Sequence, residues 1–391
     1  MDGDRQMDGP WGSLEVSPIT IQAPAELLRL KFDFSRPMFT EIVWNLSVSN
    51  RIELKVVLEE AGFSKVQVEE LLMRASWNSE TLQWVIKPTD GFVFGMDNRI
   101  RGKFYSRLVE FANNDGIKYP IRFFYRSMDE WNDDSNLKLQ TIALITKLVL
   151  PIAGGFVLYD QDLLLNQVTD RVEYGKLRIA LSGTRGLALS VKVEHRKDIE
   201  AVANYWGIGD HRVLVEPELR AMSLKSAGGK IDVIRLLPRF ARVRLNTFVY
   251  RSEFSPRKGV EYDCVWTAMN FFNEVPDDRF STDDREKLVE ALTTAIPAPN
   301  QFGDLVFLLN KDSELVHACN YIGANIVFTK NGATQFAPFV FAFMQDVMAS
   351  YGITNSADIV YRRLSYAGPT QEVGKTGEGG KEQFSSLGQI E

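Results

Sequence analysis

Cys264 is one of only two cysteines in this 391-residue chain, and it stands where a helix could activate its thiol. It follows Asp263, a residue type favoured as a helix N-cap, and it opens the apolar, helix-like run CVWTAMNFF. Unpaired N–H groups and the helix dipole favour a thiolate at such a position. Because the adjacent carboxylate opposes that effect, a nucleophilic Cys264 needs a cationic partner such as an imidazolium.

The chain has three histidines, and His317 lies in a segment that reads as a run of short strands. Residues 304–332 read as a three-strand meander, LVFLL, LVHACNYI and IVFTKN, joined by NKDSE and GAN. Alternation along the middle strand places His317 and Cys319 on one face. His195 and His211 fall in surface or turn sequence, so His317 is the candidate general base.

The turn of the meander predicts which residue lies across from the histidine. With residues 323–325 as the loop, counting outward places His317 opposite Asn331. Directly opposed side chains are close neighbours, so the amide could orient the imidazole. A register shifted by two residues would favour Thr329 instead. Lys330 points to the other face in both cases.

Three motifs of this region together resemble the NlpC/P60 branch of the papain-like cysteine peptidases: YDC before a helix, GDLVFLL at a strand entry, and HACNYIG on the next strand. The resemblance covers about residues 260–345. It implies that Cys264 is the nucleophile, His317 the general base, and Asn331 the third member of a Cys-His-Asn triad. It further implies hydrolysis of an amide bond without a metal or an organic cofactor.

The resemblance also suggests a substrate site. Tyr262 stands at the aromatic position common before the Asp-Cys pair, and we expect it to contact substrate. Bulky Val265 and Trp266 replace the small Ser-Gly of the family pattern, so Trp266 is expected to narrow the groove beside the thiol. The family pattern points to a cell-wall-type peptide or an isopeptide, and more generally to a peptide or protein amide as substrate.

Other readings stay open at this point. The papain-like domain could be a catalytically inactive scaffold or binding module whose N-terminal region recognises a protein partner. Cys319 is expected in the core or at the site wall, or in a reversible disulfide with Cys264. Residues 58–86 resemble a ubiquitin-associated three-helix domain, which would favour a protein substrate.

We expect an α+β protein in four segments. Residues 1–20 form a flexible arm, residues 21–245 a mixed α/β region, residues 246–367 the papain-like domain with its helix-start Cys on a small antiparallel sheet, and residues 368–391 a disordered tail. The formal net charge of −6 argues against a nucleic-acid partner. Two cysteines and no signal-like N-terminus indicate a reducing, cytoplasmic location without a membrane partner.

Local patterns predict individual elements of the mixed region. Residues 64–76 have helical spacing, with Ser64 as N-cap. KLRIALSG and LALSVKVEH read as two strands of a hairpin across GTRG, and RKDIEAVANYWGIG as a helix closed by Gly207. The apolar stretch 141–159 contains Pro and Gly, so it predicts two buried elements rather than a membrane span.

Overall fold

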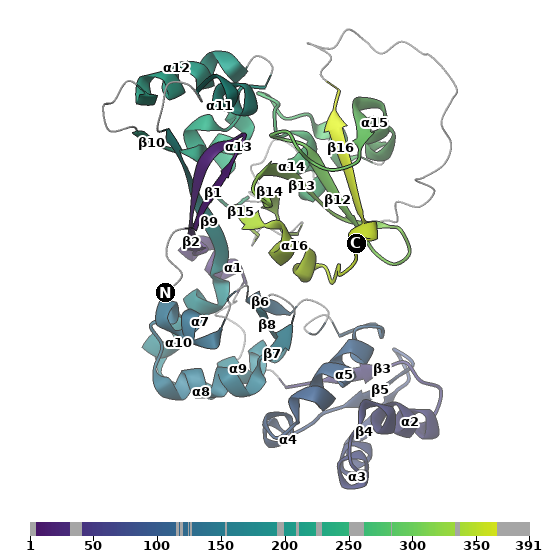
Figure 1. Cartoon of the computed structure of the whole chain (residues 1–391). Helices are drawn as coiled ribbons and strands as arrows, with labels where there is room; N and C mark the ends of the chain where they lie inside the picture. Colours follow the sequence, from purple (N-terminus) through teal and green to yellow (C-terminus); the bar gives the residue numbers. More distant parts are fainter. Residues whose placement is uncertain are drawn as a thin grey trace. The chain divides into compact units, whose positions relative to one another are not determined.

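The structure is a computed structural model, and it describes residues 5–31, 41–114, 117, 120–123, 125, 127–152, 155–193, 199–208, 211–223, 229–249, 262–282, 284–332 and 337–365. These residues form an α+β fold with antiparallel sheets (Figure 1). The chain divides into two compact units: residues 24–183, and residues 1–23 together with 184–391. The expected tail 368–391 and His195 lie outside the described residues.

The larger unit contains a six-stranded sheet that carries the candidate site, with strand order β11-β16-β12-β13-β14-β15. Its central strands are continuous apolar runs, such as LVFLL in β12, because both faces of the sheet are covered. The helix α14 packs on β13 and β14. The bounds are α14 Cys264–Met269, α15 Arg285–Leu292, β11 Thr293–Ile296, β12 Leu305–Leu309, β13 Leu315–Gly323, β14 Ile326–Lys330, β15 Phe339–Phe343, α16 Met344–Ser350 and β16 Ile359–Leu364.

The N-terminal residues are part of this unit rather than the flexible arm that we expected. They form a hairpin, β1 Arg5–Gly9 and β2 Gly12–Ile21, and β2 pairs along its length with β9 Thr184–Val193. Leu14 and Val16 of β2 are buried in the hydrophobic core beneath the sheet that β2 and β9 share. The alternation of GSLEVSPITI is a strand pattern, but the partner strand lies far along the chain, so local sequence gave no sign of the pairing.

A second sheet of the larger unit has strand order β1-β2-β9-β10 and is covered by helices. The helix predicted before Gly207 is present as α11. The remaining bounds are α11 Ile199–Trp206, α12 Arg212–Ser223, β10 Gly229–Asp232 and α13 Arg239–Arg244, with short 3₁₀ helices at Val233–Leu236, Asp278–Ser281 and Ser356–Asp358.

The smaller unit, residues 24–183, contains two three-stranded sheets, ordered β3-β5-β4 and β6-β8-β7, with helices around them. The stretch 141–159 contains three elements rather than the two that we predicted: the end of a helix and two strands. The bounds are α1 Ala25–Lys31, β3 Trp44–Leu46, α2 Arg51–Ala61, α3 Lys65–Met73, β4 Ala75–Asn78, β5 Gln83–Ile86, α4 Asp90–Phe94, α5 Asn98–Leu108, β6 Ile121–Phe123, α7 Met128–Ser135, α8 Leu139–Leu148, β7 Leu150–Ile152, β8 Gly155–Leu158, α9 Gln161–Gln167 and α10 Arg171–Ser182.

Residues 58–86 do not form the three-helix domain that they resemble. Two helices, α2 and α3, are joined at Gly62, which has a φ of 102°, and Ser64 caps α3 as predicted. The third helix is replaced by the β4–β5 hairpin, in which Trp77 pairs with Trp84. Aromatic residues favour such cross-strand pairs. The segment after α3 therefore forms a hairpin, although the two helices before it resemble those of a ubiquitin-associated domain.

The predicted hairpin across GTRG is wrong in its first strand. KLRIALS belongs to α10, and only the following segment is a strand, β9. Leu177, Ala180 and Leu181 are buried at helical spacing, and Asp170 caps the helix through the N–H groups of Val172 and Glu173. Asp170 lies upstream of KLRIALSG, so the segment that reads as a strand does not include the residue that marks the start of the helix.

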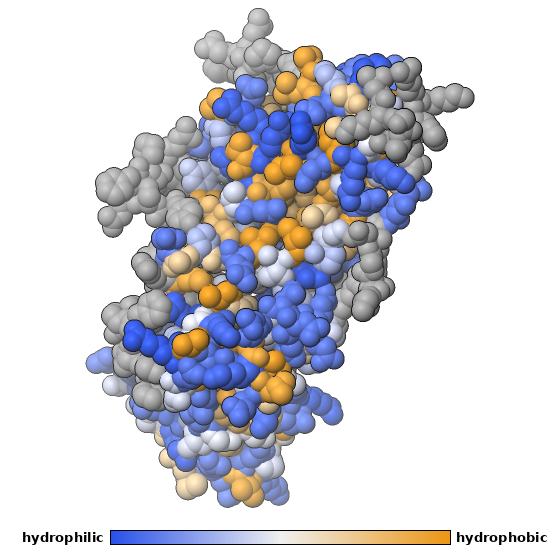
Figure 2. Space-filling model, turned by 90° about the vertical axis from the view of Figure 1, so that its left-hand side faces the viewer, coloured by the Kyte–Doolittle hydropathy of each residue, from blue (hydrophilic) through white to orange (hydrophobic). Residues whose placement is uncertain are grey.

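No helix among the residues that the structure describes is long and apolar enough to cross a membrane. On the face shown in Figure 2, apolar side chains form small groups interrupted by polar ones. Exposed apolar residues are nonetheless concentrated in one stretch of the smaller unit, on α2, α3 and the β4–β5 hairpin: Ile52, Val56, Val66, Met73, Trp77 and Leu82.

A buried polar cluster in the smaller unit joins α5 to the start of α9. The Tyr105 hydroxyl donates to Asp160 Oδ1 at 2.6 Å, and Arg101 Nε lies 3.7 Å from Asp160 Oδ2. Other N–H groups of Arg101 donate to the carbonyls of Val93 and Lys147. Burial therefore outweighs the attraction of Arg101 and raises the pKa of Asp160 to about 6.

We expect Asp160→Asn to stabilise the protein at neutral pH. The pKa of Asp160 is about 6 in the folded state and 3.8 in its ordinary state, so ionisation lowers stability as pH rises through this window, by roughly 3 kcal/mol. Urea unfolding of the full chain should show the variant exceeding wild type at about pH 7 and not at about pH 4. Asp170→Asn is the control, because Lys138 lowers the pKa of Asp170 and its loss should reduce stability at neutral pH. Equal stability of Asp160→Asn and wild type at about pH 7 would contradict this account.

Candidate functional site

Asp263 begins α14 and fixes the position of Cys264. Its Oδ1 accepts the N–H of Trp266 at 2.8 Å, and its Oδ2 accepts a hydrogen bond from Arg285 Nη1 at 2.7 Å. Cys264 is therefore the first residue of a capped helix, as the sequence predicted. The arginine also offsets part of the negative charge that the cap places beside the thiol.

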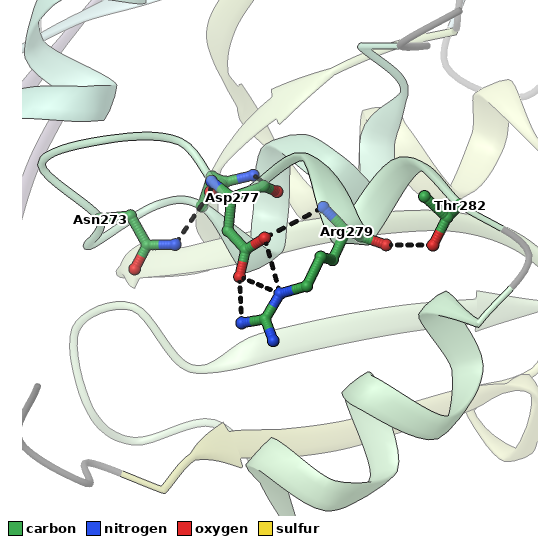
Figure 3. Close-up of polar contacts among 5 residues, drawn as sticks. Asn273, Asp277, Arg279 and Thr282 are labelled. Carbon is green, nitrogen blue, oxygen red and sulfur yellow. Dashed lines mark hydrogen bonds and ion pairs between the residues drawn. The ribbon is translucent and has the colours of Figure 1, made fainter. Parts of the chain in front are cut away.

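The other end of α14 is held by Asn270, whose side chain is fully buried. Its Nδ2 donates to the carbonyls of Trp266 and Asp277, and its Oδ1 accepts from the N–H of Asp277 and from Asn273 Nδ2. Figure 3 shows the network extending through the ion pair of Asp277 with Arg279. Every polar atom of the amide is bonded, so α14 is anchored at both ends.

The strands β12, β13 and β14 form the predicted meander. Asn320 pairs with Phe328, and Tyr321 with Val327, which is the register obtained by counting outward from the turn. Within these described strands the ladder between β13 and β14 extends no further than Asn320. If the two strands are continued in the same register beyond Asn320, His317 lies opposite Asn331.

The turn between β13 and β14 is tighter than predicted. Gly323 pairs with Ile326, so Ala324 and Asn325 alone form the turn, with φ angles of 51° and 61°. Two residues with positive φ are the mark of the turn that suits two-residue hairpins. The register shift beside Gly323 restores the predicted pairing further along the strands.

The sheet separates the two principal site residues. Cys264 packs in one core layer with Phe307 and Ala318, which lie on what we call the thiol face. His317 pairs with Leu308 and points to the opposite face, which we call the histidine face. Cys319 lies in the core layer of the histidine face. Thiol and imidazole are therefore not in contact.

Although it lies on the thiol face, the sulfur reaches the backbone of β13. The N–H of Ala318 lies against it and favours its anion. Ala318 follows His317 in β13, so the sulfur of α14 contacts the strand one residue away from the base candidate, from the opposite side of the sheet. A disulfide between Cys264 and Cys319 is not formed, since both thiols are free.

A polar chain fixes the imidazole. Thr329 Oγ1 donates to Asn331 Oδ1 at 3.0 Å, so it accepts from His317 Nε2 at 2.7 Å. This assigns the proton to Nε2 and leaves Nδ1 with its lone pair. Nδ1 is buried and has no hydrogen-bond partner. The ring also stacks on Tyr351, with 4.4 Å between ring centroids. Thr329 thus contacts the histidine directly, and Asn331 acts behind it.

Burial keeps both groups neutral. It raises the pKa of Cys264 to about 12, with Asp263 adding to the rise, while Ala318, Arg285 and Lys330 oppose it. It lowers the pKa of His317 to about 3. In this conformation the thiol is protonated and the imidazole uncharged at neutral pH, so the pair is not an ion pair.

The two expected substrate-contacting residues lie together. Tyr262 is half-buried and its ring centre is 4.4 Å from that of Trp266. Trp266 is 1% exposed and packs against Phe240, while Arg244 lies over both rings. In this conformation Trp266 is part of the core, and Tyr262 is the one of the two with accessible surface.

Sequence reasoning missed two cations near the thiol. Lys330 is fully buried on the thiol face, and its Nζ donates to the carbonyl of Gly332 at 2.6 Å. Arg285 reaches the thiol through Asp263. Alternation had already placed Lys330 away from His317, but the sequence did not show that α14 covers the face to which Lys330 points.

The aspartate of the GDLV motif has a structural role. Asp304 Oδ2 accepts the N–H groups of Asn300 and Gln301, both at 2.9 Å, and Arg363 donates to both oxygens. These bonds fix the loop that enters β12. His211, by contrast, binds the carbonyl of Leu236 away from this motif.

A scan against protein-family models matches no family, and searches of the curated proteins and of the solved structures find no match. No group of three or more His, Cys, Asp or Glu side chains suited to a metal ion occurs among the residues that the structure places. The function must therefore be argued from the geometry of the site and from the motifs.

We expect the stability of the protein to depend on pH through His317. Its pKa is about 3 when folded and 6.5 ordinarily, so stability is full above about pH 6.5 and falls as pH drops toward 3. Between pH 7 and pH 5 the loss is about 2 kcal/mol. His317→Gln should reduce the pH dependence of the unfolding free energy by that amount. His211→Gln, at a half-buried histidine, is the matched control and should change it less. An unchanged slope in His317→Gln would show that the imidazole takes up a proton in the folded state.

Proposed function

We propose that the larger unit contains a papain-like cysteine hydrolase domain of NlpC/P60 type, which cleaves an amide bond in a peptide, isopeptide or protein. Cys264 is the nucleophile and His317 the general base. The observation that carries the proposal is the position of the sulfur. A capped helix start holds it against the backbone of Ala318, next to His317 in the chain.

The proposed reaction needs only these groups and water. The thiol proton passes to His317 Nδ1 as the sulfur bonds to the amide carbonyl carbon, and N–H groups at the start of α14 receive the oxyanion. Breaking of the C–N bond releases the amine, which takes the proton from the imidazolium. A water molecule, deprotonated by the imidazole, attacks the thioester and releases the carboxylic acid, and the thiol is restored.

The state of the imidazole supports a role as base. A buried polar atom without a partner costs about 1–3 kcal/mol, and such atoms call for an explanation. His317 Nδ1 is such an atom, and the Thr329–Asn331 chain sets the tautomer that leaves it free. In the resting state the imidazole is thus neutral and has one unprotonated nitrogen, as a group that accepts a proton requires.

In this proposal the described conformation is a resting one. The thiol and the imidazole are neutral and lie on opposite faces of β13, so the attack on an amide requires them to meet on one face. Cys264 should accordingly react slowly with alkylating agents in the substrate-free protein, because its pKa is about 12.

A second candidate is a binding module with an inert papain-like domain, and the separation of Cys264 from His317 favours it. Recognition would then fall to the smaller unit. Its helices α2 and α3 expose Ile52, Val66 and Met73, and Trp77 on β4 is 43% exposed. Acidic residues on α3 argue for a protein rather than a nucleic acid as the partner.

We expect Cys264→Ala to abolish amide hydrolysis while leaving the fold intact. A panel of cell-wall-type peptides and lysine isopeptides, followed by mass spectrometry, should show a loss of turnover of about a thousandfold or more. Cys319→Ala is the matched control, since Cys319 lies on the histidine face and takes no part in the chemistry.

An acyl group on Cys264, seen in the intact mass during turnover, would support the thioester step directly. Turnover that survives in Cys264→Ala would refute the assignment of the nucleophile. If wild type neither turns over any member of the panel nor forms an acyl adduct, the binding module becomes the better reading.

A further inference from the structure

A β-bulge lies directly beside His317. Leu308 pairs with His317 but Leu309 pairs with Leu315, so Val316 is an extra residue in β13. Bulges re-aim side chains and are frequent next to active sites. Because side chains alternate along a strand, the position of the extra residue decides which face His317 occupies.

A bulge two residues further along would bring His317 to the thiol face. With Ala318 as the extra residue, His317 would pair with Phe307, whose side chain packs in the same layer as Cys264. The imidazole would then approach the sulfur from the same side of the sheet. No other side chain of β13 needs to exchange faces.

The shift is local because the flanking pairs are common to both arrangements. Leu309 remains paired with Leu315, and Val306 with Cys319. Ala318 leaves its regular place in the strand, and its side chain is a single methyl group. Apart from the imidazole, which changes layers, the core layers on both faces keep their large side chains.

Two features of the resting arrangement make such a shift accessible. The ladder that joins β13 to β14 ends at Asn320 with Phe328, so within the described strands Leu315 and residues 317–319 pair with β12 alone. His317 Nδ1 also lacks a partner where it stands, so leaving the histidine face gives up one hydrogen bond rather than two.

The thiol face offers the imidazole a free acceptor. Asn320 Nδ2 donates to the carbonyl of Ala268 in α14, whereas its Oδ1 is buried without a partner. Alternation places Asn320 on the thiol face, together with Ala318. The shift would therefore bring two atoms that now lack a hydrogen-bond partner, His317 Nδ1 and Asn320 Oδ1, nearer to possible partners on the thiol face.

We propose that the bulge of β13 is a switch of the hydrolase, whose resting state has Val316 as the extra residue and whose reacting state has Ala318. This inference rests on the proposed function of Cys264. Thr329, backed by Asn331, is then a latch that holds His317 away from the thiol. That role is opposite to the role of a triad orienter, whose loss would reduce reactivity.

The test is the rate at which iodoacetamide alkylates Cys264 in the full-length chain, measured by mass spectrometry at neutral pH. Thr329→Val keeps the shape of the side chain and removes the hydrogen bond to His317. It should accelerate alkylation by about five- to tenfold, the effect of one net hydrogen bond. Its pH profile should show a thiolate forming at lower pH than in wild type.

Three controls separate the switch from general loosening of the sheet. Thr329→Ser retains the hydroxyl and should react at the wild-type rate. Cys319, buried on the histidine face, serves as an internal thiol whose alkylation should stay slow. The double variant Thr329→Val with His317→Ala should lose the acceleration, because the imidazole is what activates the thiol.

The results also distinguish this inference from the proposed function. An unchanged rate in Thr329→Val, an equal rise at Cys319, or an acceleration that survives without His317 overturns the switch. If Thr329→Val instead lowers a turnover that depends on Cys264, Thr329 orients the histidine for catalysis. That result contradicts the switch and supports the hydrolase. If neither turnover nor accelerated alkylation is observed, the proposed hydrolase function is itself contradicted.

Discussion

Burial of both faces of the six-stranded sheet is the constraint on which the site depends. A strand delivers its side chains alternately to two separate layers, so each residue of β13 belongs either to the layer under α14 or to the layer on the other side. Cys264 enters the first layer from α14, and His317 enters the second from β13. No rotation of either side chain can bring the two together, because the strand backbone lies between them. Only a change in the strand, such as a displaced bulge, alters this relation.

The local parts of the site could be predicted from the sequence, and its assembly could not. Asp263 as cap, the meander and the register through Asn320 follow from residue types and turn spacing. Alternation also predicts that Lys330 and His317 face opposite ways. Which face α14 would cover is a matter of long-range packing: Phe271, just after the helix, contacts Phe302 and Phe328 on the thiol face. Such aromatic contacts join segments that no local pattern connects.

The same physical cause, desolvation, sets the charge of the buried groups in both units. It raises the pKa of Cys264 and of Asp160 and lowers that of His317, in every case favouring the neutral form. Neighbouring cations act in the opposite direction at the two acids but do not prevail, since Arg101 donates to carbonyls and Arg285 is engaged by Asp263. A thiolate–imidazolium pair at Cys264 would have to form by direct contact, because charge at a distance is insufficient here.

Three buried polar side chains in and beside the site differ in how completely they are hydrogen-bonded. Asn270 anchors α14 with every hydrogen-bonding position of its amide occupied, as a purely structural group requires. His317 is held just as firmly at Nε2 but leaves Nδ1 empty, and Asn320 on the opposite face leaves its Oδ1 empty. A stable core gains nothing from such vacancies, and replacing these residues by apolar ones would remove the cost. Atoms of this kind also occur elsewhere in the described residues, for example Trp44 Nε1, so it is their position on β13, one on each face, that supports the proposed second arrangement.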